Sequence, residues 1–179
     1  LSHRRGYLRD FLIRTVEEKQ LVAHQHEPDR KVKQMKPVQL SYDPETDRAT
    51  FDMGINFTGW LEFDLRRGVA GQKVLFKTAN REEMVEEFDQ LSVYIHDASG
   101  EGTFSHRFNY MAGRWMTVEG LGYEPNIDDL RGYLITNDRA RIGAFTSSDP
   151  LFNQIYESDL VTYIANTVNA AVMDCPHRE

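Results

Sequence analysis

Four side chains with the potential to do chemistry lie within the last six residues of the sequence: Asp174, His177, Arg178 and Glu179. Carboxyl and imidazole groups are common proton donors and acceptors in functional sites, and a guanidinium supplies hydrogen-bond donors. Pro176 biases the residue before it towards an extended backbone, so a helix that reaches this point should end near residue 173. The four side chains would then stand on an irregular segment that follows a helix, which favours a functional site. The alternative is a solvated helix end without a site.

The single cysteine, Cys175, excludes an internal disulfide and a zinc site built from cysteines. Because Pro176 stiffens the backbone beside it and no base is placed for it, we expect Cys175 to pack rather than to act as a nucleophile. His24 and His26 would share one face of a strand, yet no third ligand group lies nearby. We therefore expect no metal site and no cofactor.

From residue 37 to about residue 145, short runs of β-branched and aromatic residues alternate with Gly, Asn, Asp and Pro. Leu61, Phe63 and Leu65 alternate with polar residues, so they should share the buried face of a strand. Repeated strands without helices between them predict an antiparallel sandwich or jelly roll. The predicted strands lie near residues 38–40, 49–52, 60–65, 73–78, 91–96, 103–108, 114–120 and 130–136.

A helix should begin directly after this region. Asp149 or Ser148 can cap its first turn, and Pro150 fits the first helical position, where its missing N–H costs nothing. Apolar residues then recur at helical spacing as far as Ala171, which predicts a helix over about residues 150–171. Such an apolar stripe needs cover, so it should pack against helices outside this sequence or bind a partner.

Composition narrows the classes of function. The 179 residues are 40% hydrophobic, which is normal for a globular protein and excludes disorder as the main state. The apolar runs are too short to span a bilayer, so we expect no membrane partner. A net charge of -7 repels phosphate backbones and disfavours nucleic acid, whereas a neutral ligand such as a sugar is not disfavoured. No secretory signal is visible, and cytoplasmic and exported locations both stay open.

Three further segments carry recognisable patterns. Residues 51–60 read FDMGINFTGW, residues 108–120 read FNYMAGRWMTVEG, and residues 143–153 read GAFTSSDPLFN. With DCPHRE at residues 174–179, these segments resemble in order and spacing the motifs of the bacterial α-L-rhamnosidases, a family of inverting glycoside hydrolases. The resemblance extends over about residues 22–179.

The resemblance implies an architecture. In that family a β-sandwich precedes an (α/α)6 barrel, so we expect a mainly β fold: an antiparallel β-sandwich or jelly roll followed by a long α-helix that begins a truncated (α/α)6 barrel. The implied domains are an N-terminal charged segment or linker at residues 1–36, the β-sandwich at 37–146, and the first helix with the start of the catalytic loop at 147–179. The remainder of the α/α barrel domain would pack on residues 151–171.

The resemblance also assigns roles to the terminal residues. Glu179 matches the general acid, Asp174 matches a residue that binds sugar hydroxyls, and His177 and Arg178 are further candidates for substrate binding. The family's general base lies far downstream and has no counterpart in this sequence. The implied reaction releases terminal α-L-rhamnose from a rhamnose-containing glycan or glycoside with inversion.

Two other readings stay open: a non-catalytic carbohydrate-binding β-sandwich, or a structural module that only supports the barrel. Ile55 stands where the family usually has glutamine, and residues 112–113 replace a glycine–aromatic pair, so contacts between domains should differ there. We expect Trp60 and Trp115 to serve the core, and Asn56 to be a turn or inter-domain residue before it is a ligand.

Overall fold

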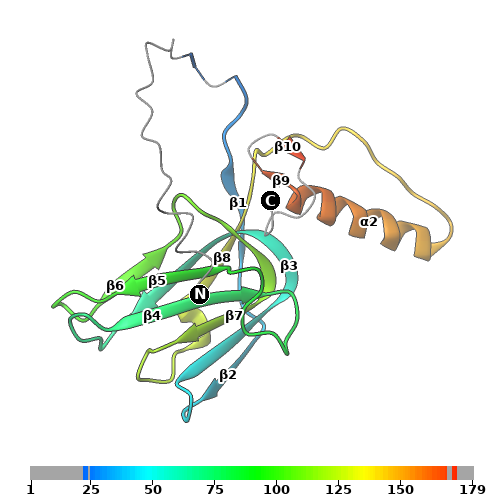
Figure 1. Cartoon of the computed structure of the whole chain (residues 1–179). Coiled ribbons are helices and arrows are strands. Elements are labelled where there is room, and N and C mark those ends of the chain that lie inside the picture. Colours follow the sequence, from blue (N-terminus) through cyan, green and yellow to red (C-terminus); the bar gives the residue numbers. More distant parts are fainter. Residues whose placement is uncertain (1–21, 24, 169–170, 173–179) are drawn as a thin grey trace, which may run out of the picture.

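The computed structural model describes residues 22–23, 25–168 and 171–172, and most of them form one curled antiparallel sheet followed by a single helix (Figure 1). The sheet has eight strands in the order β1-β8-β3-β7-β4-β5, and β2 and β6 both pair with β3. The mainly β fold class and the helix that follows it are confirmed. The strands of the sheet are β1 (Arg30–Met35), β2 (Gln39–Asp43), β3 (Arg48–Leu65), β4 (Lys73–Ala79), β5 (Leu91–Ile95), β6 (Gly102–Ser105), β7 (Met111–Glu119) and β8 (Leu130–Thr136).

Four further elements complete the described chain. A 3-10 turn, η1 (Ile127–Asp129), precedes β8, and α2 (Pro150–Ala165) follows the segment 137–149 that leads away from the sheet (Figure 1). A small hairpin of β9 (Thr167–Val168) and β10 (Ala171–Val172) follows α2.

The strand β3 organises the sheet because its two halves belong to different layers. Its first half lies between β2 and β7, and its second half lies between β8 and β6. The pairing with β7 shifts between Asp52, opposite Trp115, and Phe57, opposite Gly113. The extra residues of β3 form a bulge, and Gly54 within it has a φ of 76°, a left-handed backbone that glycine adopts without a steric penalty. The bulge bends β3 and lets the sheet curl onto itself.

Four phenylalanines from three strands, β3, β4 and β6, pack inside this curl. Phe51 and Phe63 make an edge contact at 6.0 Å between ring centroids, and Phe63 contacts Phe76 at 5.6 Å. Phe76 stacks on Phe104 at 4.0 Å. Leu61 and Leu65 are buried beside them, so the predicted buried face of residues 61–65 is confirmed. Offset and edge contacts between rings are the favoured geometries of aromatic cores.

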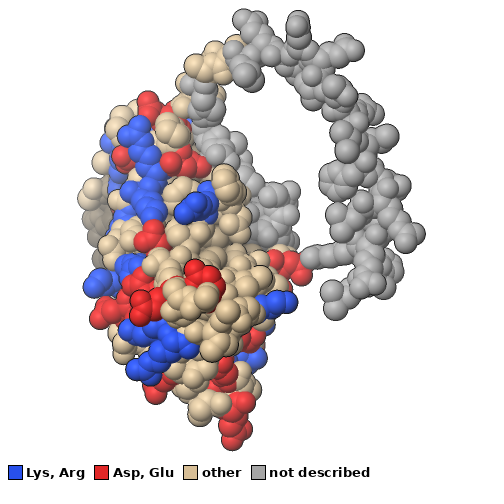
Figure 2. Space-filling model, turned by 90° about the vertical axis from the view of Figure 1, so that its left-hand side faces the viewer, with Lys and Arg blue, Asp and Glu red and all other residues tan. Residues whose placement is uncertain are grey.

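The outer surface carries charges of both signs. Figure 2 shows basic and acidic side chains interspersed on the face that it presents. Cross-strand ion pairs account for part of this pattern: Arg131 binds both carboxylate oxygens of Asp64 at 2.6 and 2.8 Å, and Glu119 accepts from Arg48 and Lys77 at 2.8 and 2.7 Å. Opposite charges on neighbouring strands support their pairing.

The predicted strands are present, but those at residues 49–52 and 60–65 are parts of the single strand β3, and the structure adds β1, β9 and β10. β1 lies at residues 30–35, inside the N-terminal segment 1–36 that the sequence suggested, and it pairs with β8. Half of the residues in its sequence RKVKQM are charged, which hides the alternation by which a strand is usually predicted. The division into domains stays a prediction.

The predicted helix over residues 150–171 is too long: α2 ends at Ala165. The N–H of Asn166 donates to the carbonyl of Thr162 at 3.0 Å, and the hydroxyl of Thr167 donates to the carbonyl of Tyr163 at 2.7 Å, so side chains and a tight last turn satisfy the helix end. Thr167 and Val168 are β-branched and buried in β9 rather than on a helical stripe. The predicted start is confirmed: Asp149 accepts from the N–H of Leu151 at 2.9 Å.

The close packing of Gly59 against β8 predicts how one substitution changes the stability of the fold. A Cβ added at Gly59 on β3 would lie 1.9 Å from the carbonyl oxygen of Tyr133 on β8. We predict that Gly59→Ala lowers the free energy of unfolding by about 3 kcal/mol or prevents folding. The backbone of β8 cannot move away from the added methyl group without breaking its pairing with β3. Urea unfolding measures this. Gly143→Ala is the control, since no atom lies within 4 Å of its added Cβ; equal effects of the two changes would contradict the packing.

A second prediction concerns the stability of the fold at acidic pH. His106 is buried and its Nδ1 accepts from the N–H of Leu61 at 3.0 Å. Burial lowers the pKa of His106 from 6.5 to about 4. Because the fold favours the neutral ring, its contribution is fully present above pH 6.5 and is lost as pH falls towards 4, by about 3 kcal/mol in total.

Urea unfolding from about pH 7 to pH 4 checks this expectation. His106→Asn keeps an acceptor for Leu61 but has no imidazole, so its unfolding free energy should fall less steeply over this range. His26→Asn, at an exposed position, is the control for loss of a histidine. The same slope in the native chain and in His106→Asn would contradict the assignment.

Candidate functional site

The predicted site residues Asp174, His177, Arg178 and Glu179 lie outside the described residues, as does Cys175. Their roles therefore stay predictions. The described chain before them forms a cleft of about 690 Å³ between the sheet and α2, and this cleft is the candidate functional surface that the structure defines.

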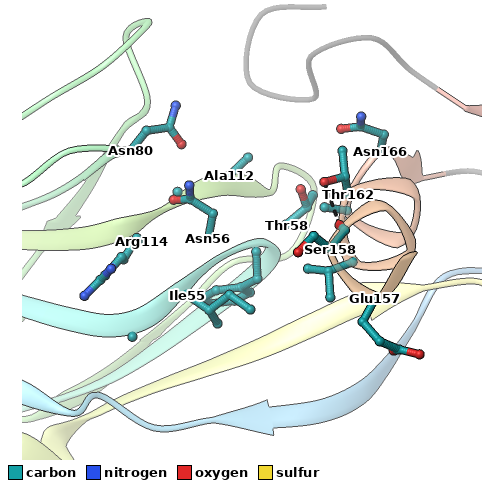
Figure 3. Close-up of a pocket in the computed structure, with 15 residues that line it drawn as sticks. Ile55, Asn56, Thr58, Asn80, Ala112, Arg114, Glu157, Ser158, Thr162 and Asn166 are labelled. Carbon is teal, nitrogen blue, oxygen red and sulfur yellow. Dashed lines mark hydrogen bonds between the residues drawn. The ribbon is translucent and has the colours of Figure 1, made fainter. Parts of the chain in front are cut away.

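The cleft lies between the bulge of β3, the start of β7 and the second half of α2 (Figure 3). Ser158, Thr162 and Asn166 follow one side of the helix, and Asn56 lies on the facing bulge. The rest of the lining mixes aliphatic, aromatic, polar and charged residues. The lining residues are Gly54, Ile55, Asn56, Phe57, Thr58, Asn80, Ala112, Gly113, Arg114, Glu157, Ser158, Val161, Thr162, Ala165 and Asn166.

The chemistry of this lining is that of binding or packing. Amides and hydroxyls can donate and accept hydrogen bonds, and the aliphatic groups bury apolar surface. Glu157 is the one carboxylate among these lining residues, and it accepts from Arg141 at 3.1 Å. The described part of the cleft thus lacks the pair of carboxyl groups that general acid–base hydrolysis of a glycoside requires.

A partly buried ion pair holds the bulge that forms one wall: Asp52 is buried, and the side chain of Arg114 is 40% exposed. Arg114 donates through Nε and Nη2 to the two carboxylate oxygens of Asp52, both at 2.6 Å, and the N–H of Gly54 donates to Asp52 Oδ1 at 2.7 Å. The guanidinium of Arg114 holds the pKa of Asp52 below its usual value, against the opposing effect of burial. The Asp52 side chain is only 6% exposed, so its charge depends on these donors. The bulge of β3 is therefore fixed by contacts within β3 and by Arg114 on β7.

Neighbouring contacts fix the start of β7. The side chain of Gln90 accepts from the N–H of Ala112 at 2.7 Å and donates to its carbonyl at 2.9 Å, which ties the loop before β5 to β7. The guanidinium of Arg114 also lies 5.2 Å from the ring of Trp115, within the range of a cation–π contact. Trp115 and Trp60 are half-buried rather than part of the closed core.

The positions at which the sequence departs from the family pattern lie on this cleft. Ile55, Ala112 and Gly113 all line it, and Ile55 is exposed. A Cβ at Gly113 would lie 2.6 Å from Thr78 Cγ2 and 2.8 Å from the carbonyl oxygen of Ala79, so an aromatic side chain does not fit there. Asn56 is exposed and faces α2. Its expected role between domains stays a prediction.

The helix α2 contacts the sheet through its second half only. Val161, Ile164 and Ala165 line a smaller pocket with residues of β1, β3 and β8. None of the 16 residues of α2 is buried, and Leu151 and Phe152 are 58% and 55% exposed. The first turn is nevertheless well built, because Asn153 accepts from the N–H of Ser147 at 2.7 Å and donates to its carbonyl at 2.9 Å. The apolar surface of α2 is thus ordered but uncovered within the described chain.

No group of three His, Cys, Asp or Glu side chains that could hold a metal ion occurs in the described part of the chain. The helix that the structure describes is neither long nor apolar enough to cross a membrane.

The curled antiparallel sheet is shared with β-rich domains of solved glycosidases. The structure aligns with the α-L-rhamnosidase of Dictyoglumus thermophilum at a TM-score of 0.74 and 24% identity, over 84% of this chain and 18% of that one. It aligns with the Streptomyces avermitilis α-L-rhamnosidase complexed with L-rhamnose at a TM-score of 0.75 and 20% identity, over 87% and 16% of the two chains. At these identities the likeness concerns the fold.

Sequence comparison defines the family. Residues 43–136 match the family model of the bacterial alpha-L-rhamnosidase concanavalin-like domain, and the chain belongs to this family. The curated alpha-L-rhamnosidase of Formosa agariphila is 31% identical over 90 residues, which is 50% of this chain and 9% of that protein. The chain thus spans only a small part of the length of the relatives that it matches.

Sequence reasoning found the segments that form the cleft but not the contacts within them. Asp52 and Arg114 stood in two recognised patterns, yet their direct pairing was not expected. The available signal was weak: an acidic and a basic residue in two strand-like segments are candidates to neutralise one another if those strands pair. The cleft itself had no sequence signal, because α2 and the bulge meet only in the folded chain.

The ion pair yields a prediction. Asp52→Ala removes the acceptor of three hydrogen bonds that hold the bulge, and we expect it to lower the free energy of unfolding by about 2 kcal/mol. Asp128→Ala is the control, because the side chain of Asp128 is 82% exposed and its contact with Lys36 is 3.7 Å long. Chemical unfolding of the three proteins decides the matter: an Asp52→Ala variant as stable as the control would show that the pair does not hold the bulge.

Proposed function

We propose that this chain is part of a longer α-L-rhamnosidase that releases terminal α-L-rhamnose from glycosides or polysaccharides. The observation that carries the proposal is the family match over residues 43–136, in a chain that spans between 9% and 18% of the curated and solved relatives reported above. Those relatives are α-L-rhamnosidases, and one of them was solved with L-rhamnose.

The proposed mechanism is inverting acid–base hydrolysis. Glu179 donates its proton to the oxygen that leaves the anomeric carbon, while a carboxylate outside this chain takes a proton from the water that attacks the opposite face. For this role Glu179 has to stay protonated near neutral pH, which a nearby carboxylate such as Asp174 favours. Asp174, His177 and Arg178 would bind the hydroxyl groups of the sugar.

The proposed partner within the longer protein is an (α/α)6 barrel of which α2 is the first helix. The uncovered side chains of Leu151, Phe152, Ile155 and Tyr163 support this proposal, because an ordered helix with exposed apolar residues needs cover. On this view residues 37–146 are the supporting sandwich, and residues 147–179 begin the catalytic domain. The cleft beside Asn56 would then lie at the junction of the two domains.

The test uses the full-length protein. Glu179→Gln removes proton donation and keeps the size of the side chain, so we expect kcat for an aryl α-L-rhamnoside to fall at least about 100-fold, while KM changes by no more than about threefold. For a substrate with a good leaving group, such as 2,4-dinitrophenolate, kcat should fall less, because the departure of this group needs less protonation.

Glu101→Gln, at an exposed position between β5 and β6, is the matched control and should leave kcat unchanged. The 179-residue chain by itself should not hydrolyse the substrate, because the base is absent. A Glu179→Gln enzyme that keeps more than a tenth of native turnover would refute the role of Glu179. A full-length protein without rhamnosidase activity would favour the non-catalytic alternative.

A further inference from the structure

A second pocket, of about 320 Å³, opens between the two layers of the sheet, with walls from β3, β4, β5 and the segment between β6 and β7. It shares no lining residue with the cleft beside α2. Of its apolar lining residues, Phe88 and Leu91 are exposed, whereas Leu61, Phe76 and Met111 are buried. Its volume is at the lower end of the range for small-molecule sites, about 300–1,000 Å³.

The polar wall of this pocket is a directed chain of hydrogen bonds. Nδ1 of His106 accepts from the N–H of Leu61 at 3.0 Å, so the neutral ring carries its hydrogen on Nε2. Nε2 lies 3.2 Å from Ser92 Oγ and donates to it, and Asn109 Nδ2 donates to the same oxygen at 3.3 Å. In this tautomer His106 is not a base for Ser92.

This arrangement leaves Ser92 with a hydrogen to donate. A hydroxyl has two acceptor lone pairs and one donor hydrogen, and both lone pairs of Ser92 Oγ receive the donors described above. Within the described chain no acceptor for the hydroxyl hydrogen of Ser92 is present. Ser92 lines the pocket, so the structure presents a fixed hydroxyl donor to whatever occupies it.

The rim has an unusual backbone. Phe88 and Asp89 are consecutive non-glycine residues in the left-handed region, with φ values of 54° and 57°. The N–H of Glu87 donates to the carbonyl of Thr78 at 3.0 Å, and Gln90 is tied to Ala112, so both ends of this strained pair are anchored. Strain of this kind persists where the surroundings fix it and clusters at ligand-binding sites.

We propose that this pocket binds one neutral pyranose sugar unit. No Lys or Arg is among its described lining residues, and the chain has a net charge of -7, so an anion is disfavoured. Apolar surface from the exposed side chains of Phe88 and Leu91 suits the C–H face of a sugar ring, and the donor of Ser92 with the amide of Asn109 suits its hydroxyl groups. The choice of a sugar over another polyol rests on the proposed function. The existence of the pocket and of its hydrogen-bond donors does not depend on that function.

The test is a titration of the ¹⁵N-labelled chain with L-rhamnose, D-glucose and D-galactose, followed by NMR. At least one sugar should shift the backbone amides of Ser92 and His106 and the side-chain amide of Asn109 saturably, with a Kd of the order of 1 mM. Ser92→Ala and Asn109→Ala should each raise that Kd roughly three- to tenfold, because each removes one hydrogen-bonding group. Ser41→Ala on β2, at an exposed position, should leave it unchanged.

The absence of saturable shifts at these residues for all three sugars up to about 100 mM, far above the expected Kd, would overturn the proposal. So would native affinity in both the Ser92→Ala and Asn109→Ala variants. The titration measures binding and not turnover, so the two proposals can fail separately. If the sugar binds in this pocket but the full-length protein has no rhamnosidase activity, only the proposed function is refuted. If the full-length protein is an active rhamnosidase but no sugar binds in this pocket, only the proposed sugar site is refuted.

Discussion

The bulge of β3 is the constraint on which the rest of this structure depends, and a single ion pair fixes it. Asp52 is buried, receives both donors of Arg114 and one from Gly54, and sits where β3 passes from one layer of the sheet to the other. Without that turn, the phenylalanines of β3 could not face those of β4 and β6 inside the curl. The same turn presents Ile55 and Asn56 to α2. Core packing and the candidate surface are thus consequences of one local geometry.

The family motifs acquire a physical meaning from this geometry. Asp52 and Gly54 belong to one pattern and Arg114 to another, and their contacts show that the two patterns describe one bulge rather than two sites. The third pattern builds the start of α2 through the cap of Asp149 and the paired hydrogen bonds of Asn153. These three patterns therefore maintain architecture, and within the proposed enzyme the chemistry is left to the fourth, residues 174–179.

Much of the fold could be predicted from local signals. Alternation at Leu61, Phe63 and Leu65 indicated a buried strand face, and Asp149 with Pro150 indicated the helix start. Long-range effects could not be predicted in the same way. Thr167 and Val168 fit an apolar helical spacing, but their burial in a hairpin ends the helix earlier. The pairing of Asp52 with Arg114 spans 62 residues and depends on a bulge that no local pattern encodes. The charges of β1 likewise mask its strand character.

The central claim is that this sheet supports a helical catalytic domain that begins with α2 and carries Glu179. A crystal structure of the full-length protein with L-rhamnose bound tests it most directly. The account predicts that further helices cover Leu151, Phe152 and Ile155, and that the carboxyl group of Glu179 lies within about 3 Å of the anomeric oxygen of the bound sugar. Side chains of α2 left in solvent, or a rhamnose bound far from Glu179, would contradict it.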